Sequence, residues 1–276
     1  MIYLDHNATT PVHPEVRGAM LECLDRAWAN PSSGYSAARQ TRAVIDEARA
    51  SVAELLGATP EEIVFTSGGT ESINTAIASA VRLHPEKPLV LNSSIEHSAC
   101  ERSAIDAAGD ANVLRLRVDR DGRYDLDHLK SLLAEHASRI ALASLMWANN
   151  ETGVLPGIEP AAAMLAAAGV PLHTDAVQAA GKVPVDVRSL PADFLSISGH
   201  KIFAPKGVGA LFVRNGAPFH PLIHGGGQEG GRRSGTEPAA LAAALGAACQ
   251  LVAGKLAAGE LDTLRDRRDR FENQLL

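Results

Sequence analysis

Short apolar segments alternate along this chain with longer segments whose apolar residues recur at helical spacing. Because the short segments are rich in Val, Ile and Leu, they predict β-strands at 62–66, 88–91, 113–116, 140–145, 170–174, 194–197 and 208–213. The segments around them predict helices at 14–28, 36–56, 70–81, 126–136, 159–168, 238–256 and 260–276, and one after His97. Such alternation is typical of an α/β fold with a mostly parallel sheet sandwiched by helices.

The composition is that of an ordered protein with no preference for nucleic acids or membranes. Hydrophobic residues make up 46% of the 276 residues and charged residues 21%, and the formal net charge of −6 disfavours a generic nucleic-acid binder. The longest apolar run, 239–249, is far shorter than a membrane span, and the first residues lack the pattern of a secretory signal. We therefore expect a cytoplasmic protein that binds no nucleic acid and no membrane.

The three cysteines, Cys23, Cys100 and Cys249, are scattered and form no Cys-x-x-Cys pair. This sparse, odd-numbered set indicates reduced thiols and not disulfides or a zinc site. The histidines and carboxylates contain no His-Glu-x-x-His motif and no EF-hand loop. We therefore expect no bound metal.

The chain divides into an N-terminal segment (1–13), a large domain (14–258) and a closing helix (259–276). Four apolar residues recur along one side of that helix: Leu261, Leu264, Phe271 and Leu275. The sequence stops there without a capping residue, although an apolar stripe needs a packing partner. We therefore expect that the chain is truncated and that a small domain follows residue 276.

A lysine follows the apolar segment 194–197, within Ser198-Gly199-His200-Lys201. Ligands bind at the carboxyl ends of strands in α/β sheets. A lysine that is partly removed from water there becomes nucleophilic enough to form a Schiff base. Taken alone, however, Lys201 fits a surface lysine in a loop better than a reactive amine.

Three other strand ends carry residues that suit the same chemistry. Asp175 would pair with the pyridinium nitrogen of a pyridoxal phosphate ring, or else cap the next helix. The small-residue turn at 66–72 would cradle a phosphate, or else serve as a plain capped turn. His97 would stack on a cofactor ring, or else lie satisfied near the core.

Eight motifs, taken together, resemble those of NifS/IscS-type cysteine desulfurases, which are class V aminotransferase-fold enzymes that use pyridoxal 5′-phosphate (PLP). They follow the family's order at 3–11, 30–33, 66–72, 96–97, 147–153, 173–178, 198–201 and 225–236. The resemblance implies the large domain of a PLP-dependent transferase of fold type I, with the small domain largely absent.

The resemblance also implies roles for individual residues. Lys201 would hold PLP as a Schiff base and move the Cα proton, and His97 would stack on the ring and assist the proton transfer. Asp175 would pair with the pyridinium nitrogen, Gln178 would contact the phenolate oxygen, and Asn150 would lie near the substrate carboxylate. The residues implied to bind the phosphate are Gly69, Thr70, Ser198, His200 and, from the other subunit of a homodimer, Thr236.

The implied reaction takes sulfur from L-cysteine as a persulfide on an enzyme thiol and releases L-alanine. The sulfur would pass to an acceptor protein for iron–sulfur cluster or thio-cofactor assembly. In the family, the persulfide cysteine lies in a loop of the C-terminal small domain, and this chain stops before that region. Only Cys100 is placed close to the expected pocket, and we expect it to be a small buried side chain.

Two alternatives remain beside a desulfurase that lacks its thiol loop. Another class V enzyme, such as a selenocysteine lyase or an aminotransferase, would use the same lysine and aspartate. A folded, dimeric but non-catalytic scaffold would keep the fold without the reaction. The motifs at 147–153 and 225–236 favour the desulfurase.

Overall fold

A computed structural model describes residues 2–275, apart from the side chains of residues 261 and 262. Its centre is a seven-stranded sheet in the order β1-β7-β6-β5-β4-β2-β3. The strands are β1 Ile63–Thr66, β2 Leu89–Ser93, β3 Val113–Leu116, β4 Ile140–Met146, β5 Leu172–Asp175, β6 Phe194–Ser198 and β7 Gly209–Val213. Only β7 runs antiparallel to its neighbours, so the expected mostly parallel sheet is confirmed.

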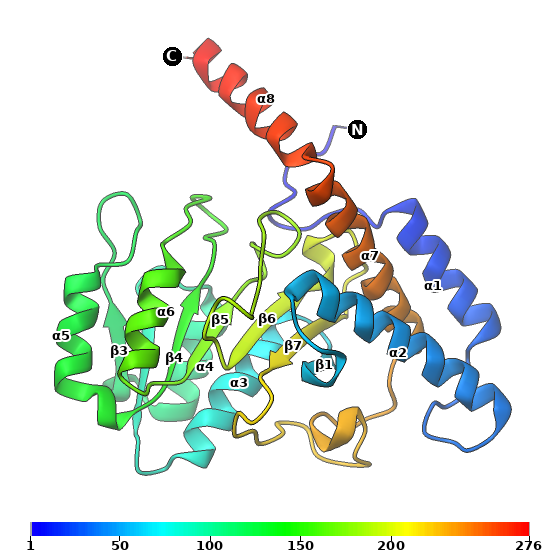
Figure 1. Ribbon diagram of the computed structural model, residues 1–276, viewed down its shortest axis with the longest axis horizontal. Coiled ribbons are helices and arrows are strands. Elements are labelled where there is room, and N and C mark those ends of the chain that lie inside the picture. The colour runs from blue at the N-terminus through cyan, green and yellow to red at the C-terminus, as the bar shows by residue number, and fades with distance from the viewer. Residues whose placement is uncertain (1, 276) are drawn as a thin grey trace.

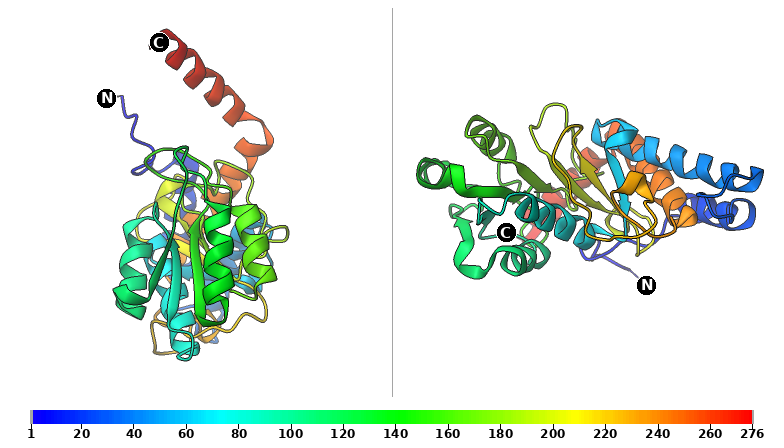
Figure 2. Two further views of the ribbon diagram at one scale, coloured as in Figure 1. Left: turned by 90° about the vertical axis from the view of Figure 1, so that its left-hand side faces the viewer. Right: turned by 90° about the horizontal axis from the view of Figure 1, so that it is seen from below.

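Helices cover both faces of this sheet, as Figures 1 and 2 show. The helices are α1 Pro14–Arg26, α2 Ser36–Leu56, α3 Gly69–Leu83, α4 Ser98–Ala108, α5 Leu126–His136, α6 Ile158–Ala167, α7 Ala239–Ala257 and α8 Glu260–Leu275. Buried side chains of α2, α5, α6 and α7 share one core with the sheet, and those of α3 and α4 pack on its other face. The α/β sandwich expected from the alternation of segments is therefore present.

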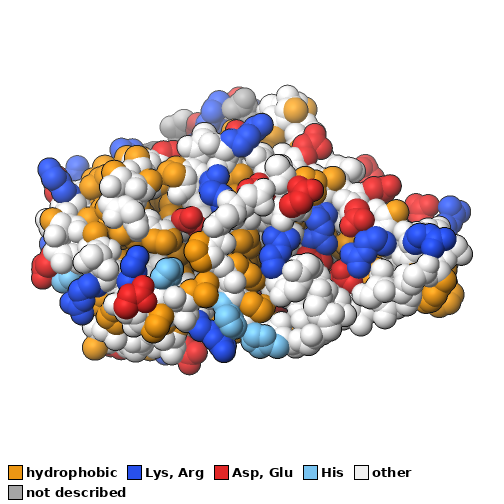
Figure 3. Space-filling model, turned by 60° about the horizontal axis from the view of Figure 1, so that its bottom comes forward, with side chains coloured by type: hydrophobic (Ala, Val, Ile, Leu, Met, Phe, Trp, Pro, Cys, Tyr) orange, Lys and Arg blue, Asp and Glu red, His pale blue; other side chains and the backbone are white. Residues whose placement is uncertain are grey.

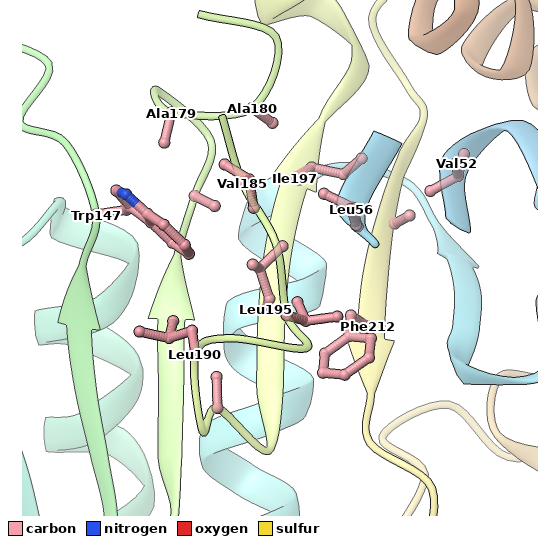
Figure 4. Close-up of a cluster of buried hydrophobic side chains, with 14 of the residues drawn as sticks. Val52, Leu56, Trp147, Ala179, Ala180, Val185, Leu190, Leu195, Ile197 and Phe212 are labelled. Atoms are coloured by element: carbon pink, nitrogen blue, oxygen red, sulfur yellow. The ribbon is translucent and has the colours of Figure 1, made fainter. Parts of the chain in front are cut away.

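Side chains alternate between the two faces along each strand, and this alternation decides where polar groups collect. Leu195 and Ile197 of β6 lie in the core beside α2, together with Phe212 of β7 and Leu56 of α2 (Figure 4). Ser196 lies between the two apolar residues and therefore points to the opposite face, which α3 and α4 cover. The polar side chains at the ends of the strands gather on that second face.

Element boundaries differ from the sequence prediction by a few residues at most. The helix predicted at 14–28 ends at Arg26, and Trp28 is exposed. The strand predicted at 170–174 begins only at Leu172, because Pro171 has no N–H to donate to a neighbouring strand. The helix at 36–56 and the strand at 113–116 have the predicted bounds.

The expectation that no segment reaches the length of a membrane span was wrong. The apolar run 239–249 continues to residue 257, and the resulting α7 is long and apolar enough to cross a membrane by length and composition alone. In this fold α7 packs against α1 and α2, and Gly246 lies so close to Ala48 of α2 that an added Cβ would come within 2.7 Å of its Cα. The small residues of α7 thus serve close helix packing.

The closing helix α8 projects from the body of the molecule (Figures 1 and 2). Leu264, Phe271 and Leu275 of the expected apolar stripe are 61%, 64% and 71% exposed. The side chain of Leu261 and the whole of residue 276 lie outside what the structure describes. The division at residues 13 and 258 and the small domain expected to follow this helix stay predictions.

Paired charges hold the segment 225–237, between β7 and α7, against α2. Arg49 donates two hydrogen bonds to Glu229, and Arg42 pairs with Glu237 at 2.7 Å. On the face shown in Figure 3, Lys and Arg side chains are interspersed with Asp and Glu. The basic side chains of this face therefore form no continuous positive patch there.

One close backbone contact fixes the loop that follows β1. A Cβ added to Gly209, the first residue of β7, would lie 2.6 Å from the carbonyl oxygen of Ile197 and 2.7 Å from the Cα of Gly68. Backbone atoms cannot yield as a flexible side chain can. The absence of a side chain at residue 209 therefore lets the loop at Gly68 lie directly against the sheet.

We expect Gly209→Ala to lower the free energy of unfolding by roughly 2–4 kcal/mol, because the new methyl group overlaps the backbone on two sides. Gly18→Ala is the matched control, since Gly18 lies within α1 with nothing within 4 Å of an added Cβ. That control should gain roughly 0.5–1 kcal/mol from helix propensity. Urea unfolding of both variants checks this, and a native midpoint for Gly209→Ala would contradict it.

Candidate active site

A cavity of about 640 Å³ opens at the carboxyl ends of the parallel strands, on the face covered by α3 and α4. Nine of the ten residues singled out from the sequence line it: Gly69, Thr70, His97, Asn150, Asp175, Gln178, Ser198, His200 and Lys201. They come from segments spread over more than a hundred residues of the chain. The structure therefore brings together in one place what the sequence presented as separate motifs.

Lys201 lies at the end of a single 3₁₀ turn, Gly199–Lys201, that directly follows β6. Its Nζ donates hydrogen bonds to the backbone oxygens of Asn7 and Ala8. Burial lowers the pKa of this amine below its ordinary value, although the carboxylate of Asp175 opposes that shift. A lowered pKa increases the neutral, nucleophilic fraction of the amine at neutral pH.

The N-terminal segment binds to the loop that carries Lys201. Thr10 donates its backbone N–H to the oxygen of His200 at 2.8 Å, and its Oγ1 accepts the N–H of Phe203 at 2.8 Å. The side chains of Thr9 and His200 are 3.1 Å apart at Oγ1 and Nδ1. These bonds place the carbonyl groups of residues 7 and 8 over the lysine, a role that residue types in the sequence do not reveal.

Asp175 ends β5, between β4 and β6, and is 5% exposed. Its Oδ1 accepts the backbone N–H of Val177 at 2.9 Å, and its other oxygen has no hydrogen-bond partner among the described residues. Burial raises the pKa of this carboxyl group, and the nearby charges of His97 and Lys201 act in the opposite direction. The site thus holds a buried carboxyl group that a cationic partner would stabilise in its ionised form.

His97 lines the cavity and also caps α4. Its Nδ1 accepts the backbone N–H of Ala99 at 3.1 Å. Since Nδ1 acts as the acceptor, the neutral ring carries its proton on Nε2. The tautomer of His97 is therefore set by the start of α4, and its Nε2–H is the group that remains for a ligand.

The first turn of α3 forms another wall of the cavity. Gly69 and Thr70 occupy its first two positions, where backbone N–H groups have no acceptor within the helix. A Cβ added to Gly69 would lie 2.7 Å from Cγ2 of Val177. Ser198 and His200 line the cavity from the end of β6. Backbone donors, a hydroxyl group and an imidazole thus face one space that would suit an anion.

Two amides complete the wall near the N-terminal segment. Gln178 donates its Nε2–H to the oxygen of Asn7 at 2.9 Å. Asn150 bonds to Glu151 at 2.6 Å, and its backbone oxygen accepts from the side chain of Asn7 at 3.4 Å. The amide of Gln178 thus shares the Asn7 carbonyl with Lys201, and Asn150 contacts the side chain of Asn7 through its backbone.

Thr236 is the one expected residue that the structure does not bring into the cavity. It is exposed, and it does not line the cavity in this single chain. Its neighbour Arg233 pairs with Glu71 of α3 at 2.8 Å, which keeps the segment beside the first turn of that helix. The role expected for Thr236 needs a second subunit and stays a prediction.

A buried polar row lies below Asp175. The Nδ1 of His173 is 2.8 Å from Ser144 Oγ on β4, and its Nε2 is 2.8 Å from Ser196 Oγ on β6. All three side chains are fully buried, and burial lowers the pKa of His173 to about 3. This histidine is therefore uncharged at neutral pH, and it links three strands beneath the cavity.

Glu96, which belongs to the motif at 96–97 but had no predicted role, carries a second buried carboxyl group. Its Oε1 accepts Ser93 Oγ at 2.6 Å and the N–H of Met146 at 2.9 Å, while its Oε2 has no partner among the described residues. Burial raises its pKa to about 8. The carboxyl group is thus protonated at neutral pH and ties the end of β2 to that of β4.

We expect the free energy of unfolding of Glu96→Gln to increase, relative to that of the native chain, as pH rises. An unfolded glutamate ionises near its ordinary pKa of 4.5, whereas folded Glu96 keeps its proton up to about 8. The native state therefore binds more protons in this window, so its stability falls with rising pH. Glutamine does not titrate, and the difference in unfolding free energy should grow by about 1–3 kcal/mol in its favour.

Chemical denaturation at pH 5 and pH 8 measures this difference. Glu54→Gln, on the exposed side of α2, is the control for a carboxyl group at the surface. A difference that stays constant between the two pH values would show that Glu96 ionises like an ordinary glutamate.

Comparison with known proteins shows which family this chain resembles. The model of the class-V aminotransferases matches residues 2–269 of this chain. The chain is 47% identical over 254 residues to the cysteine desulfurase NifS of Azotobacter vinelandii, and it covers 62% of that protein with 90% of its own length. It is 44% identical to a cysteine desulfurase of Cereibacter sphaeroides, with 100% of this chain and 70% of that protein aligned.

A solved structure titled SspA in complex with cysteine superposes on the chain with a TM-score of 0.85 and 36% identity. The superposition covers 91% of this chain and 72% of the other, so the sheet and its helices are shared. The chain spans roughly two thirds of the length of these relatives. The chain therefore belongs to the class-V aminotransferases and, within them, to the cysteine desulfurases.

Proposed function

We propose that this chain binds PLP at Lys201 and uses it to remove sulfur from L-cysteine. The observation that carries the proposal is that Lys201 and Asp175 line one cavity together with the first turn of α3. An amine, a buried carboxyl group and a set of anion donors are the three features that a pyridine aldehyde phosphate requires of a site.

The residues of the cavity fit this cofactor. The oxygen of Asp175 without a hydrogen-bond partner suits a protonated ring nitrogen, because a cation there would offset the burial that raises the carboxyl pKa. The backbone donors at Gly69 and Thr70 suit the phosphate group. Lys201 suits the aldehyde, since burial has lowered the pKa of its amine.

When bound, PLP supplies an electron sink that stabilises negative charge next to the substrate Cα. The chain's own residues then hold and move protons around that sink. The Lys201 amine lines the cavity beside the carbonyl groups of residues 7 and 8, where it serves as a base. His97 presents Nε2–H as a donor, and Asn150 offers an amide for a carboxylate.

The thiols of this chain do not suit the sulfur-accepting step. Cys23, Cys100 and Cys249 are all buried. Burial raises the pKa of Cys100 well above its ordinary value and that of Cys249 to about 12, so neither forms the reactive thiolate. We infer that residues 1–276 bind the cofactor and the substrate, while the persulfide needs a thiol from elsewhere.

The substrate, the acceptor and the assembly follow from the relatives as proposals. The structure titled as a complex with cysteine supports L-cysteine as the substrate. A homodimer would bring Thr236 of a second subunit toward the phosphate site, and an acceptor protein for iron–sulfur cluster or thio-cofactor assembly would receive the sulfur. Three free cysteines and the absence of disulfides among the described residues support a cytoplasmic location.

We expect the purified chain with PLP to be yellow, and borohydride to fix the cofactor covalently on Lys201. Lys201→Ala should lose the covalent adduct, because Lys201 is the lysine whose charge acts on Asp175. Peptide mass spectrometry after reduction locates the adduct. An adduct on Lys182 or Lys206, or none in the native chain at saturating PLP, would contradict the proposal.

We expect the chain alone to form no persulfide on incubation with L-cysteine, because its thiols are buried. Intact-mass measurement would detect the added sulfur atom, and amino-acid analysis would detect L-alanine. Cys100→Ser should leave both measurements unchanged. A persulfide located on Cys100 would show that its burial does not keep it from reacting.

A further inference from the structure

Lys182 lies four residues after Gln178, in the turn that follows β5. Its Nζ donates a hydrogen bond to Oε1 of Gln178. The side chain is partly buried and lines a second cavity, next to the one that holds the active-site residues. Neither the sequence motifs nor the proposed reaction gives this lysine a role.

The two partners of Gln178 fix the orientation of its amide. An ammonium group can only donate, so the atom that faces Lys182 must be the oxygen. A backbone carbonyl can only accept, so the atom that faces Asn7 must be the nitrogen. Both partners demand the same orientation, and a flipped amide would lose both hydrogen bonds.

The same carbonyl group of Asn7 also accepts from Lys201. A continuous chain of hydrogen bonds therefore runs from Lys182 through Gln178 to Asn7, where it meets the amine of Lys201. The amide nitrogen of Gln178 carries two N–H groups, and Asn7 takes one of them. The second N–H remains for an acceptor in the cavity that Gln178 lines.

We propose that Lys182 is a positioning residue: it holds the Gln178 amide with its oxygen turned away from the cavity, so that an N–H group is presented to an oxygen acceptor on the cofactor. This inference rests on the proposed binding of PLP. The ammonium group also polarises the amide, and a hydrogen bond at its oxygen strengthens the donors at its nitrogen.

Lys182 remains a donor at neutral pH although its surroundings disfavour the ammonium form. Burial and the neighbouring charge of Lys201 lower its pKa to about 8, so it is mostly protonated at neutral pH. Lys201 in turn faces the acidic groups of Asp175, Asp5 and Glu151. These carboxylates thus act on Lys201, and the hydrogen bond of the Lys182 side chain among the described residues is with the amide of Gln178.

The test is a double-mutant cycle on the affinity for PLP. Lys182→Met keeps the aliphatic stem and removes the donor, and we expect it to raise the dissociation constant roughly three- to tenfold. In a Gln178→Ala background the same substitution should raise the dissociation constant less than about twofold, because the amide that Lys182 orients is absent. Lys182→Arg keeps a cationic donor and should restore most of the affinity.

Lys206→Met is the matched control. Lys206 also lines the cavity, but it has no hydrogen bond to Gln178 among the described residues. Its loss removes a positive charge and should weaken binding by the same factor in both backgrounds. An equal effect of Lys182→Met in both backgrounds would show that Lys182 acts through charge alone and would overturn the proposal.

Thermal unfolding of each variant without PLP confirms that it is folded, and Lys182→Gln repeats the cycle if Lys182→Met does not fold. Borohydride fixation on Lys201 is recorded for every variant. A native chain that takes up no PLP refutes the proposed function itself. Native uptake with no change in any Lys182 variant refutes only the role of Lys182.

Discussion

A carboxyl group held out of water at the end of a parallel strand is the constraint from which the rest of this site follows. Asp175 is 5% exposed, and burial opposes its ionisation. The amine of Lys201 and the ring of His97 lie near this carboxyl group and act in the opposite direction, toward a lower pKa. A buried acid surrounded in this way is stable only where the strand ends, loops and helix starts around it are all in place.

The alternation of side chains along each strand gives the two faces of the sheet different roles in this arrangement. The face toward α2 and α7 is apolar, and the opposite face carries Ser144, His173 and Ser196 two residues or less from the strand ends. Because His173 stays neutral and bonds to both hydroxyl groups, it adds no charge beneath Asp175. The polar row therefore fixes three strands relative to one another without competing for the cation that the carboxyl group needs.

The sequence predicted the sheet and its helices, and nine of the ten site residues predicted from it line the cavity. Hydrophobic alternation and strand-end motifs are properties of residue type and spacing. The sequence did not predict Asn7 and Ala8 as the partners of Lys201, since their contribution is a backbone carbonyl that any residue possesses. The contact between Lys182 and Gln178 could have been predicted, because the two residues are only four positions apart in the sequence. Glu96 could not, because its neutral state depends on burial that only the packed strands create.

The predicted length of the apolar segment was wrong for a related reason. The run 239–249 is short when counted by apolar residues, but the helix it begins tolerates Gln250 and Lys255 and continues to residue 257. Helix length is decided by backbone hydrogen bonds and packing against α1 and α2, and not by apolar count alone.

The position of β7 between β1 and β6 has a consequence for the order in which the molecule is completed. β1 is the first strand to leave the ribosome, yet its only neighbour in the sheet is β7, whose paired residues lie roughly 150 positions later. Until that late strand is synthesised, β1 has no partner strand. The loop at Gly68 likewise lacks Gly209 of β7, against which it packs in the folded chain. The corner formed by the loop at Gly68 and the start of α3 is thus completed only after β5 and β6, which lead to Asp175 and Lys201, are made.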